Sequence, residues 1–207
     1  MKTNTIGMTA SSHLDLGCGS HARNPYGRDY LIGCDMVKLE QVDPLSNFTF
    51  IEADLTTNLL PFENSTFESI SAFDFIEHVP RQAYDNDNRT YSPFIKLMNE
   101  IHRVLKPGGL FLASTPAYPR PEAFQDPTHV NIITEKTHEY FCGEDPYASR
   151  YGFTGQFQLI RSEWEPQKSN YNGKSSSLRK WYRKNIEFRF FKGGLSHLTW
   201  EFSAVKK

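Results

Sequence analysis

The sequence lacks several features that would mark particular classes of protein. Its 3 cysteines include no C-x-x-C pair, so neither a zinc knuckle nor a redox motif is expected. No apolar run approaches the roughly 18 residues of a membrane span, and the polar start MKTNTIGMTASS has no apolar core of a signal peptide. The formal net charge of −1 gives no general attraction to polyanions. These absences predict a soluble, cytoplasmic protein.

Strand and helix signals alternate along the first half of the chain. Short apolar segments that end at glycine or aspartate predict strands over 13–17, 29–35, 47–54 and 67–75. Apolar residues recur with a helical period over 92–105, KPGG ends that helix, and LFLAST follows as a buried strand. Strands separated by crossovers predict an α/β fold, a doubly wound and mostly parallel sheet with helices on both faces. We expect one domain over 1–207.

The segment HLDLGCGSHARNPYG contains a glycine turn with an unusual ending. In the dinucleotide-binding pattern G-x-G-x-x-G the third glycine follows three positions after the second, and here that position is Ala22. Gly17 and Gly19 let the backbone approach a ligand closely. Asp15 would repel a pyrophosphate but could pair, directly or through water, with the cation of a sulfonium amino acid. The turn therefore favours an adenosyl amino acid over the nicotinamide cofactor of a dehydrogenase.

Aspartates stand at the ends of the next predicted strands. In an open parallel sheet, ligands bind at the carboxyl ends of the strands. Asp35, 20 residues after Asp15, can accept hydrogen bonds from both ribose hydroxyls. Asp54 can receive the adenine amine, and Leu55 offers a backbone N–H and an apolar face. Phe73 and Asp74 follow as a side wall.

Five ordered motifs resemble class I S-adenosylmethionine-dependent methyltransferases: LDLGCG, an acid that ends the second strand, EADL, LPFENSTFESISAFDFIEHV and EIHRVLKPGGLFLASTP. The resemblance covers about residues 13–116. It implies a Rossmann-like seven-stranded sheet whose last strand is antiparallel between the fifth and sixth, and S-adenosyl-L-methionine as cofactor. Its expected contacts are Asp15, Leu16, Gly17 and Gly19 for the methionine part, Asp35 and Met36 for the ribose, and Asp54, Leu55, Phe73 and Asp74 for the adenine and the wall.

The chain departs from the family's usual pattern in its first crossover. Only about a dozen residues, including Pro25, separate Gly19 from the second strand, so the helix there must be very short or distorted. This compact opening, together with a later DPTHV, is similar to a subset of the family associated with surface-saccharide biosynthesis.

Candidate catalytic residues come from two segments. QDPTHVN, 125–131, contains Asp126 and His129, and a histidine held by a carboxylate could take the proton of a sugar hydroxyl. The alternative is that both residues cap and hydrogen-bond the insertion. His78, after Glu77 in FDFIEHVP, could act as a base or could position the cofactor. Metal ligation by Asp126, His129 and His138 is conceivable, but their spacing matches no recognisable ligand set, and we expect no metal.

Two segments in the second half of the chain lie outside the motifs that resemble this family. Residues 116–155, rich in Pro, Tyr, Phe and His, predict a lid or substrate wall. Residues 168–192 interleave basic and aromatic side chains. This stretch could contact an anionic membrane surface that holds a lipid-linked acceptor, could contact nucleic-acid phosphates, or could form a solvated face or dimer contact.

These observations predict O-methylation of a small-molecule or saccharide acceptor by a monomer or homodimer. One alternative is a nucleic-acid methyltransferase, which the presence of FDFI instead of an N-P-P-Y signature after the fourth strand disfavours. The other is a non-catalytic module that binds S-adenosylmethionine.

Overall fold

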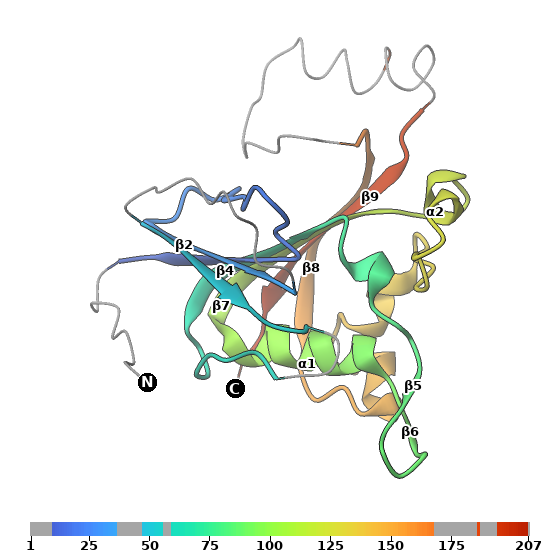
Figure 1. The fold of residues 1–207 in the computed structure, drawn as a ribbon, viewed down its shortest axis with the longest axis horizontal. Coiled ribbons are helices and arrows are strands. Elements are labelled where there is room, and N and C mark those ends of the chain that lie inside the picture. Colours follow the sequence, from blue (N-terminus) through green and yellow to red (C-terminus); the bar gives the residue numbers. More distant parts are fainter. Residues whose placement is uncertain (1–9, 37–46, 56–58, 168–185, 187–193, 207) are drawn as a thin grey trace.

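A seven-stranded sheet forms the centre of the computed structural model, which describes residues 10–36, 47–55, 59–167, 186 and 194–206 (Figure 1). The strand order is β3-β2-β1-β4-β7-β9-β8. The first five strands in this order are parallel, and β9 is antiparallel to both of its neighbours. This confirms the predicted mixed sheet. Its strands are β1 (Ser12–Leu16), β2 (Tyr30–Asp35), β3 (Phe48–Glu52), β4 (Phe67–Phe73), β7 (Leu105–Pro116), β8 (Phe157–Glu165) and β9 (His197–Ala204).

Helix α1 (Pro93–Val104) packs along one face of the sheet (Figure 1). Proline in its first turn costs no hydrogen bond, since the N–H groups there have no intrahelical partner. The helix agrees within one residue with the predicted range 92–105. Its buried side is Phe94, Leu97, Met98, Ile101 and Val104.

Strand β7 begins at Leu105, directly after the helix and five residues before the predicted strand over 110–115. Gly108 has a φ of +71°, and the pairing of β4 with β7 shifts register between Phe67 and Ser69. KPGG therefore ends the helix as predicted, but it does so as an irregular part of the strand rather than as a separate turn.

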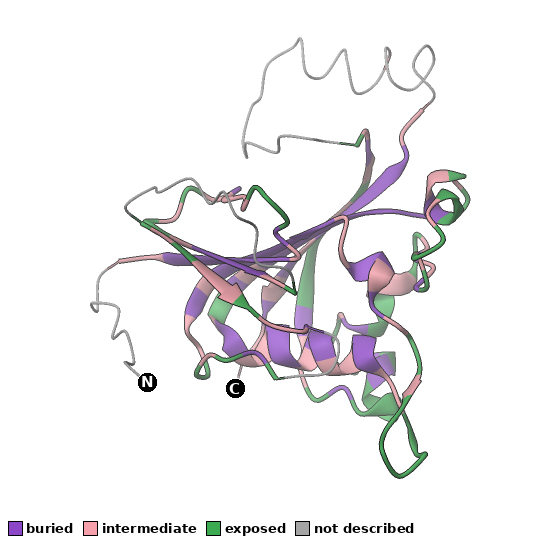
Figure 2. Ribbon diagram, viewed as in Figure 1, coloured by how far each residue is buried: buried purple, intermediate pink, exposed green. Residues whose placement is uncertain are grey.

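The two faces of the sheet differ in chemistry because side chains alternate along each strand. Alternate residues of β1 and β4 join the apolar core beneath α1, where Figure 2 shows the buried residues concentrated. His13 and Asp15 of β1 lie on the opposite face. There they share hydrogen bonds of 2.5–2.8 Å with Ser69 and Ser71 of β4. The opposite face thus carries a buried polar row.

The connection from β1 to β2, residues 17–29, contains turns and bends but no helix, whereas a very short or distorted helix was expected from its length and Pro25. It reaches across the polar face, where the Tyr26 hydroxyl donates to the Glu201 carboxylate of β9 at 2.7 Å. Helices were expected on both faces of the sheet. Among the described residues, α1 packs on one face, and this loop, rather than a helix, lies over the polar row on the opposite face.

The segments after β4 and β7 form the carboxyl edge of the sheet and one flank. After β4 come the 3₁₀ turn η1 (Ile76–His78) and the hairpin β5 (Ala83–Tyr84) with β6 (Thr90–Tyr91). The insertion after β7 contains α2 (Glu122–Gln125), η2 (Thr137–Tyr140) and η3 (Tyr147–Tyr151). Buried Phe141 contacts Phe94 and Phe153 edge-on at ring distances of 5.4 and 5.2 Å. The insertion is therefore packed firmly against the start of α1.

The basic and aromatic segment 168–192 falls almost entirely outside the described residues, so its three interpretations stay predictions. In the part of the chain that the structure does describe, no helix has the length and apolar character needed to cross a membrane.

Candidate active site

The turn after β1 combines a packing constraint with an open surface. Gly17 and Gly19 have φ values of +62° and +53°, a conformation that favours glycine. Gly17 N donates to Cys34 O at 2.8 Å, and Gly19 N donates to Oδ2 of Asp35 at 2.9 Å. A Cβ on Gly17 would lie 2.4 Å from the Phe75 ring, whereas nothing lies within 4 Å of the corresponding position on Gly19. A ligand can therefore approach the backbone at Gly19.

Asp15 lies beneath this turn and is 1% exposed. Its Oδ1 accepts from the Ser71 hydroxyl at 2.5 Å, and its Oδ2 accepts from Arg23 N at 2.7 Å. Burial raises the pKa of Asp15 to about 7. Because both oxygens already have protein donors, the geometry favours an indirect contact with a ligand. Leu16 is fully buried, so its backbone alone is left for such a contact.

The ends of β2 and β3 bring the next predicted residues to one edge. Asp35 is the last residue of β2, and its carbonyl accepts from Ala53 N, just after β3, at 2.9 Å. Met36 follows with 59% of its surface exposed. Asp54 comes next after Ala53, and Leu55 is 4% exposed. A carboxylate beside an open glycine turn suits the hydroxyls of a ribose, so this edge fits an adenosyl group.

Phe73, the last residue of β4, and Asp74, which follows it, were predicted to form a side wall, and each has a partner that the sequence did not indicate. Phe73 is buried and the Arg23 guanidinium lies over its ring at 4.6 Å. Asp74 adopts a φ of +50°, and its Oδ1 lies 2.8 Å from Nε2 of His197. His197 is 3% exposed, and its Nδ1 lies 2.8 Å from the Ser196 hydroxyl.

His197 and Arg23 were not identified from the sequence. A signal for His197 was present, because a last strand that runs antiparallel brings its first residue to the carboxyl edge of its neighbours. Arg23 had no such signal, since its position depends on the path of an irregular loop.

A second group of residues forms where η1 meets the segment 125–131. The rings of His78 and His129 lie edge to face with centroids 4.8 Å apart, although the residues are about fifty positions apart in the chain. Thr128 Oγ1 donates to Asp126 Oδ1 at 2.6 Å and lies 2.9 Å from Nδ1 of His78. Since the hydroxyl has a single hydrogen, which goes to Asp126, Nδ1 of His78 is the donor in the second bond.

The carboxylate thus orients a different histidine from the one predicted. Asp126 Oδ2 lies 3.9 Å from Nε2 of His129, beyond hydrogen-bond distance. Nδ1 of His129 instead donates to Ala123 O at 3.3 Å. Asp126, through Thr128, holds His78.

Glu77 connects the two segments. It is 1% exposed, its Oε2 accepts from the Thr115 hydroxyl at 2.7 Å, and burial raises its pKa to about 8. Its carbonyl accepts from Val130 N at 3.0 Å and Asn131 N at 2.8 Å. These backbone bonds explain why 125–131 lies against η1. His138, the third member of the metal set that the sequence made conceivable, instead lies with its ring 6.3 Å from that of Trp200.

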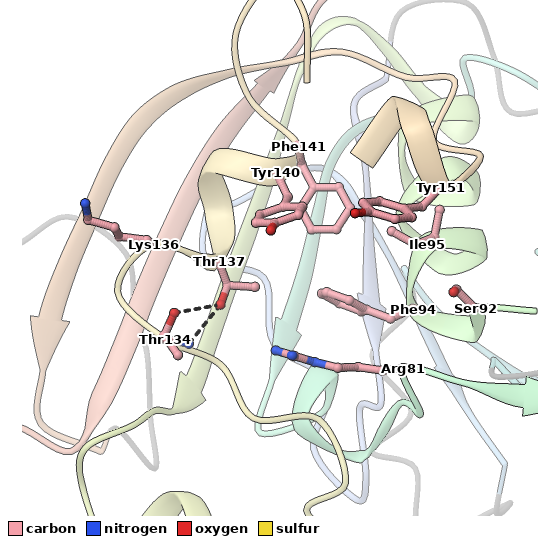
Figure 3. A pocket seen from close by; sticks show the side chains of 10 residues that line it. All are labelled: Arg81, Ser92, Phe94, Ile95, Thr134, Lys136, Thr137, Tyr140, Phe141 and Tyr151. Atoms are coloured by element: carbon pink, nitrogen blue, oxygen red, sulfur yellow. Dashed lines mark hydrogen bonds between the residues drawn. The ribbon is translucent and has the colours of Figure 1, made fainter. Parts of the chain in front are cut away.

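A pocket of about 370 Å³ lies between the start of α1 and the insertion (Figure 3). Aromatic rings form its walls and Arg81 lies at one edge, whereas the Lys136 amine points away from the other lining side chains (Figure 3). Arg81 Nε donates to Asn131 Oδ1 at 2.6 Å, which links the pocket to the carbonyl of Glu77. None of the predicted cofactor residues is among its lining. The lining consists of Arg81, Ser92, Phe94, Ile95, Thr134, Lys136, Thr137, Tyr140, Phe141 and Tyr151.

Comparison with known proteins agrees with this arrangement. Residues 5–154 match the family described as "Methyltransferase domain". Three solved structures share the fold over 94–96% of this chain. An S-adenosylmethionine-dependent methyltransferase from Archaeoglobus fulgidus has 16% identity, a TM-score of 0.54 and 86% of its own chain covered. The YcgJ protein from Bacillus subtilis has 18% identity, a TM-score of 0.52 and 93% covered.

The third is the 1,6-didemethyltoxoflavin-N1-methyltransferase from Burkholderia thailandensis, which was solved with 1,6-didemethyltoxoflavin and S-adenosylhomocysteine bound. It has 16% identity, a TM-score of 0.54 and 72% of its own chain covered. No curated protein matches the sequence. The sheet order, the glycine turn and a family match over more than half of the chain lead to one conclusion: the chain belongs to the Methyltransferase domain family and is a class I S-adenosylmethionine-dependent methyltransferase.

Proposed function

We propose that this methyltransferase methylates a hydroxyl oxygen of a small-molecule or saccharide acceptor. The observation that carries the proposal is the pairing of His78 with His129. His78 lies five residues after the end of β4, close in sequence to the predicted cofactor wall. Both imidazoles donate through Nδ1, to Thr128 and to Ala123 O, which leaves the two Nε2 atoms to act on an acceptor hydroxyl.

The proposal assigns to the cofactor residues the roles that the sequence predicts. Gly17, Gly19 and, indirectly, Asp15 and Leu16 serve the methionine part. Asp35 with Met36 takes the ribose, and the remaining residues, Asp54, Leu55, Phe73 and Asp74, take the adenine and the wall. The cofactor supplies a methyl carbon on a positively charged sulfur, so the acceptor oxygen forms the new bond to carbon while the electron pair of the broken carbon–sulfur bond stays on sulfur.

Proton removal is the part that this chain must supply. A sugar hydroxyl is a poor nucleophile until its proton is taken, and a histidine is the usual group for this work near neutral pH. His129 takes this role in the proposal, and His78, held by Asp126 through Thr128, orients the hydroxyl. Proximity contributes the larger share of the rate.

The pocket beside Arg81, whose lining includes neither His78 nor His129, would hold a part of the acceptor away from the reacting hydroxyl. A volume of about 370 Å³ is at the lower end of the range for small-molecule sites, and the aromatic walls suit the apolar face of a sugar ring. Arg81 at the edge of the pocket adds a preference for an acceptor that carries negative charge, such as a phosphorylated saccharide.

The test is methyl transfer from labelled S-adenosylmethionine to three acceptor classes: nucleotide sugars and simple glycosides, amino sugars, and oligonucleotides. Label on hydroxyl acceptors, lowered at least tenfold by His129→Ala and by Asp126→Ala but not by His138→Ala, supports the proposal. Label on oligonucleotides alone would favour the nucleic-acid alternative. Cofactor binding that survives with turnover unchanged by these two variants would favour a site elsewhere or a non-catalytic module.

A further inference from the structure

We propose that Glu77, His78 and His129 bind a divalent transition-metal ion at the carboxyl end of β4. Each residue offers one ligand atom, and the three atoms lie within 4.8 Å of one another. The residues come from η1 and from the insertion, so the fold assembles the group rather than one local motif. Metal binding does not depend on the proposed function. Only the role that we give the ion in methyl transfer rests on the proposed function.

The buried carboxylate of Glu77 is an independent indication of a missing partner. Oε2 accepts from Thr115, but Oε1 is buried and has no hydrogen-bond partner among the described residues. A buried polar atom without a partner is costly, and native proteins rarely retain one without a function. A cation between this carboxylate and the two imidazoles would satisfy it.

The two histidines are held in the orientation that metal ligands adopt. In His78, Nδ1 donates to Thr128, whose hydroxyl donates to Asp126. In His129, Nδ1 donates to Ala123 O. Ligating histidines commonly donate their second nitrogen to a carbonyl or to a carboxylate-linked group, which fixes the ring and its tautomer. The atoms left for an ion are therefore the two Nε2 atoms.

The donor set indicates the class of ion. Two imidazole nitrogens and one carboxylate oxygen suit Zn²⁺, Co²⁺, Mn²⁺ or Fe²⁺, whereas Mg²⁺ and Ca²⁺ prefer oxygen ligands. Three protein ligands leave positions for water or substrate, as in catalytic rather than structural sites.

An ion at this site would change how the proposed reaction removes the proton of the acceptor hydroxyl. It would bind the acceptor hydroxyl and lower its pKa, and the proton would pass to water. His78 and His129 would then act on the hydroxyl through the ion, and His129 would no longer be needed as the base.

The experiment uses the full chain after treatment with EDTA and titration with Co²⁺ and, separately, Zn²⁺. We expect one ion per chain by calorimetry, with visible absorption bands for Co²⁺ bound to nitrogen ligands. His129→Ala and Glu77→Gln should each weaken binding at least tenfold, and His138→Ala, a histidine of the same insertion outside the group, should not. Circular dichroism of the metal-free variants shows whether each one folds.

Wild-type protein provides a test that needs no variant. Paramagnetic Co²⁺ should shift or broaden the imidazole NMR signals of two histidines while sparing those of His138. No binding by the wild type, or equal binding by His129→Ala, would overturn the metal site. S-adenosylhomocysteine binding in EDTA is measured in the same samples, because its retention would leave the methyltransferase function intact while the metal proposal fails.

Discussion

Nε2 of His197 lies 2.8 Å from Oδ1 of Asp74, which joins the first residue of β9 to the residue that follows β4. His197 is buried and Asp74 is partly exposed at the carboxyl edge. Asp74 also adopts a left-handed backbone conformation, and its N–H donates to Ser114 O at 2.9 Å. The pair therefore fixes the position of a carboxylate in the wall of the predicted cofactor site.

His197→Ala should lower the free energy of unfolding by about 1–3 kcal/mol, because it removes a buried hydrogen bond to a charged group and leaves a cavity. His21→Ala, at an exposed histidine, is the control and should change it by less than about 0.5 kcal/mol. Urea unfolding measures both. Equal stability of the two variants would show that the bond contributes little.

Gly17→Ala should be more destabilising than Gly19→Ala. Both substitutions force alanine into a left-handed conformation at a cost of about 1–2 kcal/mol. The new methyl group of Gly17→Ala also collides with the Phe75 ring, which adds about 1–3 kcal/mol, whereas that of Gly19→Ala enters open space. Chemical denaturation gives the difference, and a Gly19→Ala variant that is the less stable of the two would contradict the assigned packing.

The buried pair His13 and Asp15 should give opposite pH dependences of stability. Burial raises the pKa of Asp15 from 3.8 to about 7, so between these values the folded state keeps a proton that the unfolded state has lost, and stability falls as pH rises. Burial, with a contribution from the charge of Arg28, lowers the pKa of His13 from 6.5 to about 3. Between those values the unfolded state holds the extra proton, and stability rises with pH.

The two effects oppose each other between about pH 4 and pH 6.5, and each amounts to at most about 1.4 kcal/mol per pH unit. Asp15→Asn should therefore show stability that rises with pH relative to wild type, and His13→Gln stability that falls. Unfolding at pH 4.5, 5.5 and 6.5 measures the slopes against the wild type, which carries the same background of surface groups. Slopes of the same sign in both variants would contradict these pKa directions.

Asn131→Ala should impair methyl transfer more than cofactor binding. Asn131 is 1% exposed, and its side chain donates to Ile76 O at 2.9 Å and accepts from Arg81. Without the Asn131 side chain, the hydrogen bonds through which it connects segment 125–131 to η1 and to Arg81 of the pocket are lost. We expect at least a tenfold loss of turnover, with the Kd for S-adenosylhomocysteine changed less than twofold. The reverse pattern would place Asn131 with the cofactor instead.

The sequence predicted the sheet because its strands are local apolar runs that end at polar turns. Asp35 and Asp54 could be placed at one edge, since parallel strands all present their carboxyl ends to the same side. The glycine turn was equally local, and the φ values of Gly17 and Gly19 agree with it.

The meeting of His78 and His129 could not be predicted in the same way. It depends on backbone bonds from Val130 and Asn131 to the Glu77 carbonyl, which no periodicity encodes. The packing of the loop that contains Tyr26 over the polar face also depends on contacts between residues far apart in the sequence. His13 and Asp15 alternate with leucines in β1, and this alternation alone does not say whether a helix or a loop lies above them.

The most direct test of the cofactor site is calorimetric titration of the wild-type chain with S-adenosylhomocysteine, repeated on Asp35→Asn. One saturable site is expected, and Asp35→Asn should bind about ten- to a hundredfold more weakly, because a carboxylate that accepts hydrogen bonds from the ligand is lost while the amide oxygen still accepts from Gly19 N. Asp87→Asn, at an exposed residue between β5 and β6, is the control and should bind like wild type. No binding by the wild type, or unchanged affinity in Asp35→Asn, would contradict a cofactor site at the glycine turn.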